Sequence, residues 1–403
     1  MNETCSVLGL GYLGLPTAAL LADSGYEVFG YDVKKEIVEK INNAEIHIIE
    51  KNLLEIVQKV VKSKKLLAIE ELIPADVFLI TVPTPFKKTI NAIPEPDISF
   101  VLNAAKKIAN VLRKGNLVII ESTSPVNTTN KVLSLLSQES GLDKNEFHLC
   151  YCPERVLPGK ILEELKTNDR IIGCQSKNSG IIAKNFYKAF CKGKLILTNY
   201  NTAELTKLAE NAYRDVNIAY ANELSMICEE VSVDVRELIN LTNLHPRVNI
   251  LNPGCGVGGH CIAVDPWFIA SEAPEISNLI QTARKINKKK VNWTVEKVKK
   301  KVSIFTKKNS RSPIIACLGL AFKPNIDDYR ESPALEIFKE LVSQDLDVIA
   351  CDPNIKSINS IEIKGLDYVI EKSDLIVALV AHDCFKNKDF KDKVIIDICG
   401  LTN

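Results

Sequence analysis

The sequence predicts an α/β protein with two doubly wound, Rossmann-like domains joined by a long central helix and a helical middle region. Three observations predict this fold. Short apolar runs alternate with helical stretches over roughly the first 150 residues, and the same alternation returns near residue 312. Between these blocks, residues 201–233 contain neither Gly nor Pro. Such strand–helix alternation is typical of parallel sheets covered by helices on both faces. We expect three domains, at 1–200, 201–305 and 306–403.

Composition limits the function classes. The 403 residues are 46% hydrophobic and 25% charged, as in ordinary folded proteins. The chain has 51 basic and 50 acidic residues, so its net charge is +1. We therefore expect no nucleic-acid binding. The twelve cysteines include no C-x-x-C pair, so we expect no metal site. The sequence shows no leader-like start and no apolar run of 18 residues. We therefore expect a cytoplasmic protein with reduced cysteines and no membrane association.

The first block contains five predicted strands and at least three predicted helices. The strand-like apolar runs occupy 6–10, 27–31, 77–82, 117–120 and 148–151. Helical spacing of apolar residues occurs over 16–24, 34–42 and 98–112.

The middle region is predicted to be helical on both sides of an irregular stretch. Asn201 matches the N-cap of a helix, and Glu204 matches the glutamate expected three positions after the cap. We therefore expect a helix of about 30 residues to begin at Asn201. A Pro- and Gly-rich stretch follows at 245–266, and helical sequence resumes to about residue 301. The second block then has strand-like runs at 314–320, 347–351, 375–380 and 394–398.

Gly9, Gly11 and Gly14 form a G-x-G-x-x-G motif that follows the first strand and opens the first helix. This turn lets backbone approach a pyrophosphate, and the helix N-terminus adds free N–H groups and a partial positive charge. Asp32 lies 18 positions after Gly14, where a carboxylate can accept the ribose hydroxyls and repel a 2′-phosphate. We therefore predict NAD as the cofactor; a purely structural glycine turn is the alternative.

The second block lacks this glycine triplet, because its first strand leads into Gly319-Leu-Ala-Phe-Lys323. We therefore expect no second dinucleotide there. Ligands of open α/β sheets bind beyond the carboxyl ends of the strands. Lys323 and Arg330 follow such an end, so they are candidates for binding the phosphates or a carboxylate of a substrate. Ordinary surface charges are the alternative.

A cysteine among glycines is the candidate nucleophile. Four glycines within six residues precede Cys261 and suit a loop that approaches a ligand closely. Asp265 lies four positions later, on the same face if a helix begins at Cys261. A helix N-terminus would also lower the pKa of this thiol. Cys255 is the rival thiol, and a buried structural cysteine is the alternative.

Three further polar residues are candidates. Lys207 and Asn211 lie four positions apart on the long helix, and both can donate hydrogen bonds to an oxyanion. An exposed Lys–Asn pair would have the same spacing. Glu154 follows a strand and is either a base or a surface acid.

Taken together, the motifs resemble those of the UDP-glucose/GDP-mannose dehydrogenase family over essentially the whole chain. Besides the Lys207/Asn211 helix, the matching segments are GLGYLGLP (9–16), TVPTP (81–85), ESTSPVNTT (121–129), CPERVLPG (152–159), GVGGHCIAVDPWF (256–268) and GLAFKPNIDDYRESP (319–333). Within the family, CPERVLPGKILEELKTNDR, HPRVNIL and GGHCIAVDPWF look most like enzymes that oxidise UDP-N-acetyl-D-mannosamine. His260 stands where UDP-glucose dehydrogenases typically carry Ser.

The resemblance implies a four-electron oxidation of the sugar C6 to a carboxylate, with two NAD per UDP-sugar, for surface polysaccharide biosynthesis. The cysteine would attack the intermediate aldehyde, and water would hydrolyse the resulting thioester. The implied catalytic residues are Cys261, Lys207, Asn211, Asp265, Glu154 and Thr123, the last near the attacking water. The implied cofactor-binding residues are Gly9, Gly11, Tyr12, Leu13, Gly14, Asp32, Pro83, Thr84, Thr123 and Arg330.

The resemblance also implies how the substrate is bound. Residues 1–200 would bind NAD, 201–305 would dimerise and carry catalytic groups, and 306–403 would bind the UDP-sugar. Arg247 would reach the sugar nucleotide of a neighbouring subunit in a homodimer built on the long helix. The implied substrate-binding residues are Arg155, Val156, Leu157, Lys207, Asn211, Arg247, Gly258 and Lys323.

Three alternatives remain open. A two-electron hydroxyacid or sugar-acid dehydrogenase also places Lys and Asn on a central helix, but it gives Cys261 no role. A non-enzymatic nucleotide-binding scaffold would bind ligand without forming NADH. Within the family, UDP-N-acetyl-D-glucosamine 6-dehydrogenase is the nearest competitor, since the two substrates differ at the sugar C2 alone.

Overall fold

The computed structural model describes residues 3–87, 93–259, 261–390 and 393–402. The chain forms two compact units, Met1–Ala209 and Glu210–Asn403. The division between them falls inside the long helix α8 (Tyr200–Glu230). The three domains predicted from the sequence therefore stay a prediction.

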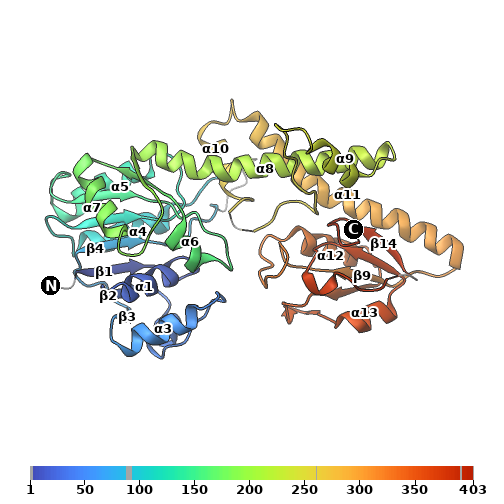
Figure 1. The fold of residues 1–403 in the computed structure, drawn as a ribbon, viewed down its shortest axis with the longest axis horizontal. Helices are drawn as coiled ribbons and strands as arrows, with labels where there is room; N and C mark the ends of the chain where they lie inside the picture. Colours follow the sequence, from blue (N-terminus) through green and yellow to red (C-terminus); the bar gives the residue numbers. More distant parts are fainter. Residues whose placement is uncertain (1–2, 88–92, 260, 391–392, 403) are drawn as a thin grey trace. The chain divides into compact units, whose positions relative to one another are not determined.

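Unit 1 is built on an eight-stranded sheet with the order β3-β2-β1-β4-β5-β6-β7-β8 (Figure 1). Neighbouring strands are parallel except β6 and β7. The order reverses between β1 and β4, which is where doubly wound sheets bind ligands at their carboxyl ends. The strands are β1 (Thr4–Leu8), β2 (Glu27–Tyr31), β3 (Leu66–Ile69), β4 (Val77–Ile80), β5 (Leu117–Ile120), β6 (His148–Tyr151), β7 (Arg170–Cys174) and β8 (Leu195–Thr198).

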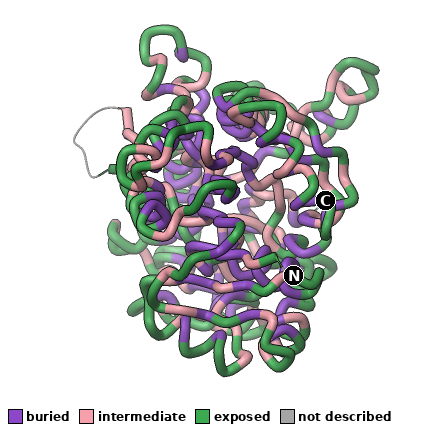
Figure 2. Tube along the Cα trace, turned by 90° about the vertical axis from the view of Figure 1, so that its left-hand side faces the viewer, coloured by how far each residue is buried: buried purple, intermediate pink, exposed green. Residues whose placement is uncertain are grey.

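Helices cover both faces of this sheet because alternate strand residues point to opposite sides. Val77 and Leu79 belong to one apolar cluster, with residues of α1, α3, α6 and α7. Phe78 and Ile80 belong to a second cluster, with residues of α4 and α5. Buried segments fill the interior in Figure 2. The helices are α1 (Gly14–Asp23), α2 (Lys35–Asn42), α3 (Leu53–Lys62), α4 (Ser99–Ala109), α5 (Thr128–Ser140), α6 (Ile161–Thr167) and α7 (Lys177–Tyr187).

Unit 2 combines a helical region with a four-stranded parallel sheet of order β10-β9-β13-β14. Residues of α11 and α12 pack on one face of this sheet, and those of α13 and η1 pack on the other. A short antiparallel pair, β11 (Ser357–Ile358) and β12 (Ile361–Glu362), forms a separate two-stranded sheet. The strands are β9 (Ile315–Leu318), β10 (Val348–Cys351), β13 (Leu375–Ala378) and β14 (Val394–Asp397). The helices are α9 (Val235–Thr242), α10 (Asp265–Glu272), α11 (Asn278–Asn309), α12 (Pro333–Ser343), α13 (Leu366–Lys372) and the 3-10 turn η1 (Asp383–Phe385).

The predicted fold class is confirmed: two Rossmann-like sheets flank a helical middle region. Each predicted strand is present, with its ends shifted by two residues at most. Sequence reasoning missed β3, β7, β8 and the short pair β11 and β12. Within the described part of the chain, no helix combines the length and apolarity needed to cross a bilayer.

The predicted start of the long helix is wrong by one residue, and its predicted cap is wrong. The helix α8 begins at Tyr200, and Asn199 Oδ1 accepts a hydrogen bond from the Thr202 N–H (2.9 Å). Glu204 does not fold back on its own helix. Its carboxylate accepts hydrogen bonds from the Asn127 and Thr129 N–H groups at the start of α5.

The helix α11 buries a lysine in the core of unit 2. Lys290 donates from Nζ to the Ser225 hydroxyl (2.7 Å), and its ammonium lies 3.7 Å from the centre of the Trp293 ring. Burial is the main cause that lowers the pKa of Lys290 from 10.5 to about 7. The charge of Lys297 also lowers the pKa of Lys290, whereas the charge of Glu229 raises it.

We expect Lys290→Met to stabilise unit 2 in a pH-dependent way. The pKa of Lys290 lies lower in the folded protein than in the unfolded chain, so unfolding takes up a proton between about pH 7 and pH 10.5. Native stability therefore rises with pH in this window, by up to about 1.4 kcal/mol per unit, and the full penalty is present below it. The gain from methionine should be larger at pH 6.5 than at pH 9.5 in thermal melting. Lys289→Met, at the exposed neighbour, is the control, and an equal gain at both pH values would contradict this account.

Candidate active site

The predicted phosphate turn lies between β1 and α1, beside the reversal of strand order. Gly9 has a φ of +96°, a left-handed conformation that favours glycine. A Cβ on Gly14 would overlap the carbonyl oxygen of Gly9, so close packing requires glycine there. A Cβ on Gly11 would meet no atom of the described residues within 4 Å. Gly11 therefore borders open space at the N-terminus of α1, where a pyrophosphate can approach.

Asp32 is held by backbone beside this turn. Its Oδ2 accepts a hydrogen bond from the Leu10 N–H and its Oδ1 from the Lys34 N–H, both at 2.9 Å. Each carboxylate oxygen has two lone-pair directions, so both oxygens retain capacity for a ribose hydroxyl. The glycine turn and this carboxylate together fit the adenosine diphosphate half of NAD.

The neighbouring loops carry the other predicted cofactor residues of unit 1. Pro83 and Thr84 follow β4, and Thr123 follows β5. The Thr84 hydroxyl donates to the Thr123 carbonyl oxygen (2.7 Å), so the two loops are joined. Tyr12 and Leu13 are half-buried within the phosphate turn.

The structure pairs Lys207 with Glu154. Lys207 Nζ donates to Glu154 Oε1 (3.1 Å), and Lys207 is 5% exposed. The other carboxylate oxygen of Glu154 accepts a hydrogen bond from the Val156 N–H (3.0 Å). Arg155 and Leu157 lie in the same loop after β6. A buried ammonium beside a carboxylate can stabilise developing negative charge and exchange a proton.

In unit 2, Cys261 lies in a turn before α10. The helix begins at Asp265, so the condition under which Cys261 and Asp265 would share a helix face, a helix that begins at Cys261, is not met. The Cys261 carbonyl oxygen accepts hydrogen bonds from the Val264 and Asp265 N–H groups, at 3.0 and 2.8 Å. The carboxylate of Asp265 accepts a hydrogen bond from Asn211 Nδ2 (2.6 Å). The structure thus brings Asn211 and Asp265 together next to the cysteine turn.

The glycines before Cys261 pack on the loop that carries Lys323 and Arg330. A Cβ on Gly258 would overlap a carbonyl oxygen of this loop, and one on Gly259 would lie 3.0 Å from the Phe322 ring. The Gly259 N–H donates to the Arg330 carbonyl oxygen (3.3 Å). Close backbone packing therefore explains why this segment is rich in glycine. His260 lies outside the described residues.

Cys255, the rival thiol, is buried. Its thiol donates to the Leu379 carbonyl oxygen (3.2 Å), and burial raises the pKa of Cys255 to about 12. A buried, protonated thiol is a poor nucleophile at neutral pH. The rival assignment is therefore not supported.

Unit 2 repeats one hydrogen bond of the predicted NAD site, but the carboxylate that accepts it is buried. The Leu320 N–H donates to Asp352 Oδ2 (2.8 Å), as the Leu10 N–H does to Asp32. Asp352 is 5% exposed, and the same oxygen lies 3.3 Å from His382 Nε2. Burial acts to raise the pKa of Asp352, but hydrogen bonds from His382 and backbone N–H groups lower it overall. This burial is a physical reason to expect no second dinucleotide here.

Sequence reasoning passed over several buried polar residues on α8. They share a face with Lys207 and Asn211, and their spacing of three, four or seven positions is a signal that could have found them. They are Asp215, Asn222 and Ser225.

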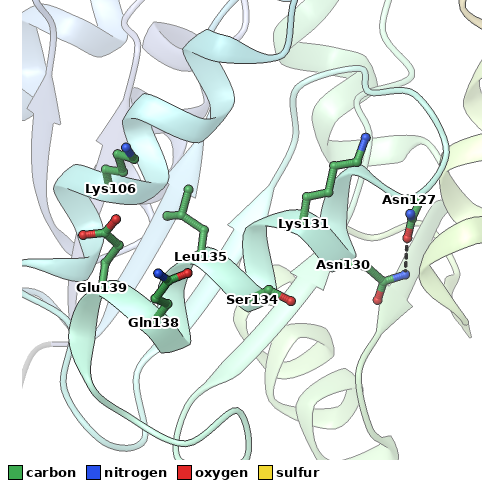
Figure 3. Close-up of a pocket in the computed structure, with 8 residues that line it drawn as sticks. All are labelled: Lys106, Asn127, Asn130, Lys131, Ser134, Leu135, Gln138 and Glu139. Atoms are coloured by element: carbon green, nitrogen blue, oxygen red, sulfur yellow. Dashed lines mark hydrogen bonds between the residues drawn. The ribbon is translucent and has the colours of Figure 1, made fainter.

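The remaining predicted residues and a surface hollow complete the description of the site. Arg247 is exposed after α9, and Lys323 is half-buried after β9. Within the described ranges, no cluster of three or more His, Cys, Asp or Glu side chains could hold a metal. A polar hollow beside α4 and α5 contains none of the predicted site residues (Figure 3). It is lined by Lys106, Asn127, Asn130, Lys131, Ser134, Leu135, Gln138 and Glu139.

Family models match nearly the whole chain. They describe the NAD binding domain (residues 3–191), the central domain (201–289) and the UDP binding domain (316–403) of one family. The chain belongs to the UDP-glucose/GDP-mannose dehydrogenase family. This dehydrogenase therefore uses NAD, and its UDP binding domain indicates a UDP-sugar substrate.

Relatives with about equal identity to the dehydrogenase differ in the substrate they are named for. It is 47% identical to a UDP-N-acetyl-D-mannosamine dehydrogenase of Campylobacter jejuni, over 98% of each chain. It is also 47% identical to an NDP-N-acetyl-D-galactosaminuronic acid dehydrogenase of Ralstonia solanacearum, over 99% of this chain and 96% of that one. A solved UDP-D-ManNAc dehydrogenase of Pyrococcus horikoshii superposes with a TM-score of 0.90 and 39% identity, over 99% of this chain and 96% of that one.

The phosphate turn yields a matched pair of variants. Gly11→Ala should leave thermal stability unchanged, because the added Cβ meets no described protein atom. The same Cβ would occupy the space that the pyrophosphate approaches, so the KM for NAD should rise at least about tenfold, which corresponds to ~1.4 kcal/mol. Gly14→Ala should lower stability by about 1–3 kcal/mol through overlap with Gly9. Melting curves and NAD titrations of both variants distinguish the two effects. Loss of stability in Gly11→Ala with a normal KM would contradict the assignment.

Proposed function

We propose that the dehydrogenase oxidises UDP-N-acetyl-D-mannosamine at C6 to UDP-N-acetyl-D-mannosaminuronate, in two steps, for surface polysaccharide biosynthesis. The observation that supports the two-step chemistry is the cysteine turn. Cys261 lies four residues before Asp265, and the carboxylate of Asp265 is hydrogen-bonded to Asn211. The names of the relatives from Campylobacter jejuni and Pyrococcus horikoshii support the substrate. The twelve cysteines, all among the described residues, are free thiols, which supports a reducing, cytoplasmic location.

The first oxidation converts the C6 alcohol to an aldehyde. When bound, NAD accepts a hydride from C6 in each of the two oxidations. Lys207 stabilises the alkoxide as the hydroxyl proton leaves, and its partner Glu154 keeps the ammonium in place. Asp265 and Glu154 are the groups that take up protons.

The second oxidation needs the cysteine. The Cys261 thiolate attacks the aldehyde carbon, so that an S–C bond forms and the carbonyl oxygen becomes an alkoxide. Lys207 and Asn211 stabilise this oxygen by charge and hydrogen bonding. The thiohemiacetal carbon carries both hydrogen and oxygen, so a second hydride can leave and a thioester results. Water near Thr123, deprotonated by Glu154, then attacks the thioester and releases the carboxylate and the thiolate.

A second candidate substrate has a specific observation in its favour. The Ralstonia solanacearum relative, named for NDP-N-acetyl-D-galactosaminuronic acid, is as similar in identity as the one from Campylobacter jejuni. UDP-N-acetyl-D-glucosamine remains the other competitor. The candidate sugars differ in the configuration of ring carbons, so a few contacts decide among them.

Substrate preference tests this proposal. We expect kcat/KM for UDP-N-acetyl-D-mannosamine to exceed that for UDP-N-acetyl-D-glucosamine and UDP-N-acetyl-D-galactosamine by at least about tenfold, since a few contacts supply ~1–3 kcal/mol of discrimination. Initial rates of NADH formation with the three sugars measure it. A preference for either of the other sugars would overturn the substrate while leaving the chemistry intact.

We also propose a homodimer in which Arg247 reaches the UDP-sugar bound by the neighbouring subunit. The helix α8 exposes Tyr213, Tyr220 and Ile227, at intervals of seven residues, and all three are more than half exposed. An apolar stripe with this period suits packing against a second copy of the same helix. The exposed position of Arg247 is compatible with this role.

Mixing two inactive variants tests the shared site. Arg247→Ala and Cys261→Ala each remove one required group. If Arg247 acts across the interface, a hybrid dimer has one complete site, and random re-association restores up to about a quarter of wild-type activity. Denaturing and refolding the variants together, with each one alone as control, measures this recovery. Absence of recovery in hybrids of demonstrated dimeric mass would contradict the proposal.

A further inference from the structure

The helix α8 buries more polar side chains than the reaction uses. Asp215 and Asn222 lie one turn and three turns beyond Asn211 on the same face, and both are 0% exposed. A buried polar group without a hydrogen-bond partner costs free energy of folding. The hydrogen-bond partners of Asp215 and Asn222 therefore show which segments these two residues hold in place. Those partners lie on α11 and in the glycine segment that precedes Cys261.

A chain of hydrogen bonds joins α8, α11 and this segment. Asn222 Oδ1 accepts from the Gly254 N–H (2.8 Å), and its Nδ2 donates to Asn287 Oδ1 (2.9 Å). Asn287 Nδ2 in turn donates to Asp215 Oδ1 (2.8 Å), which also receives Arg284 Nη1 (2.7 Å).

The carboxylate at the end of this chain sets its direction. An ionised Asp215 can accept hydrogen bonds but not donate them, so Asn287 must turn its amide N–H toward Asp215. The oxygen of Asn287 then faces Asn222, and Asn222 must turn its own N–H group toward it. The oxygen of Asn222 is thereby left facing the Gly254 N–H. Each amide has one favourable orientation, and the segment has one docking position.

The same helix also holds the far end of the segment. Asn211 donates to Asp265, four residues after Cys261. Near the first end, a Cβ on Gly256 would lie 2.7 Å from the Asn287 carbonyl oxygen, so the backbone rests on α11. The described residues at the two ends of the segment, Gly254 and Asp265, are thus fastened to α8 by Asn222 and Asn211, about 16 Å apart at 1.5 Å per residue.

We propose that Asn222 and Asn287 are positioning residues for the Cys261 thiol, acting through the segment rather than on the substrate. This inference rests on the proposed two-step reaction. A small misplacement of a nucleophile is sufficient to slow its attack strongly. The first oxidation does not use the thiol, so displacement of the segment should slow the second oxidation selectively.

Single-turnover kinetics test this inference. With enzyme in excess over UDP-N-acetyl-D-mannosamine, Asn222→Ala should form the first NADH within about twofold of the wild-type rate and the second at least about tenfold more slowly. Asn287→Ala should show the same split. Asn292→Ala, at an exposed position on α11, is the matched control and should behave as wild type.

A conservative variant guards against misfolding. Asn222→Gln keeps both an acceptor for the Gly254 N–H and a donor for Asn287 Oδ1, so it should fold and recover more of the second rate than Asn222→Ala. Equal slowing of both oxidations, or an unchanged second oxidation, would overturn the inference. If the wild-type enzyme itself forms a single NADH, the proposed function fails instead, so the two failures are distinguishable.

Discussion

A helix that buries charged and amide side chains must provide a partner for each of them, and this requirement organises the site. An unpaired buried polar group costs ~1–3 kcal/mol. Along α8, Glu204 is paired with the start of α5, Lys207 with Glu154, and Asn211 with Asp265. Each pairing fixes a loop that carries predicted site residues. Hydrogen bonds to one helix therefore determine where the loop after β6 and the cysteine turn lie on their own units, and the fold around them supplies the rigidity.

The sheets were largely predictable because strands buried on both faces appear in the sequence as short, continuous apolar runs. The strand β4 is an example, with all four residues buried. The strands β3 (LLAI) and β8 (LILT) were missed although they are short apolar runs as well, because periodicity alone does not distinguish a run of four residues from part of a neighbouring helix. The cap of α8 could not be predicted, since Asn199 and Asn201 are equally suitable cap residues. Tertiary contacts decide between these two caps, because the Glu204 carboxylate accepts hydrogen bonds from the start of α5 and not from its own helix.

The site was predictable where the chemistry depends on local sequence. The glycine turn and Asp32 lie on adjacent elements, and their spacing sets their geometry. Burial is not visible in the sequence, so Cys255 could be excluded as a nucleophile only once its packing was known. The pairing of Asn222 with Asn287 joins positions 65 residues apart. No local pattern reveals such a contact, although a polar residue on every turn of one helical face is an indication.

We propose that the cysteine turn supports a four-electron oxidation. It requires a thiol that holds the aldehyde carbon while a second hydride leaves, and a water that then releases the acid. The most direct measurement is the amount of NADH formed per UDP-N-acetyl-D-mannosamine consumed at completion, with the product mass determined in the same sample. We predict two NADH and a carboxylate product. One NADH, with an aldehyde or a ketone as product, would contradict the account.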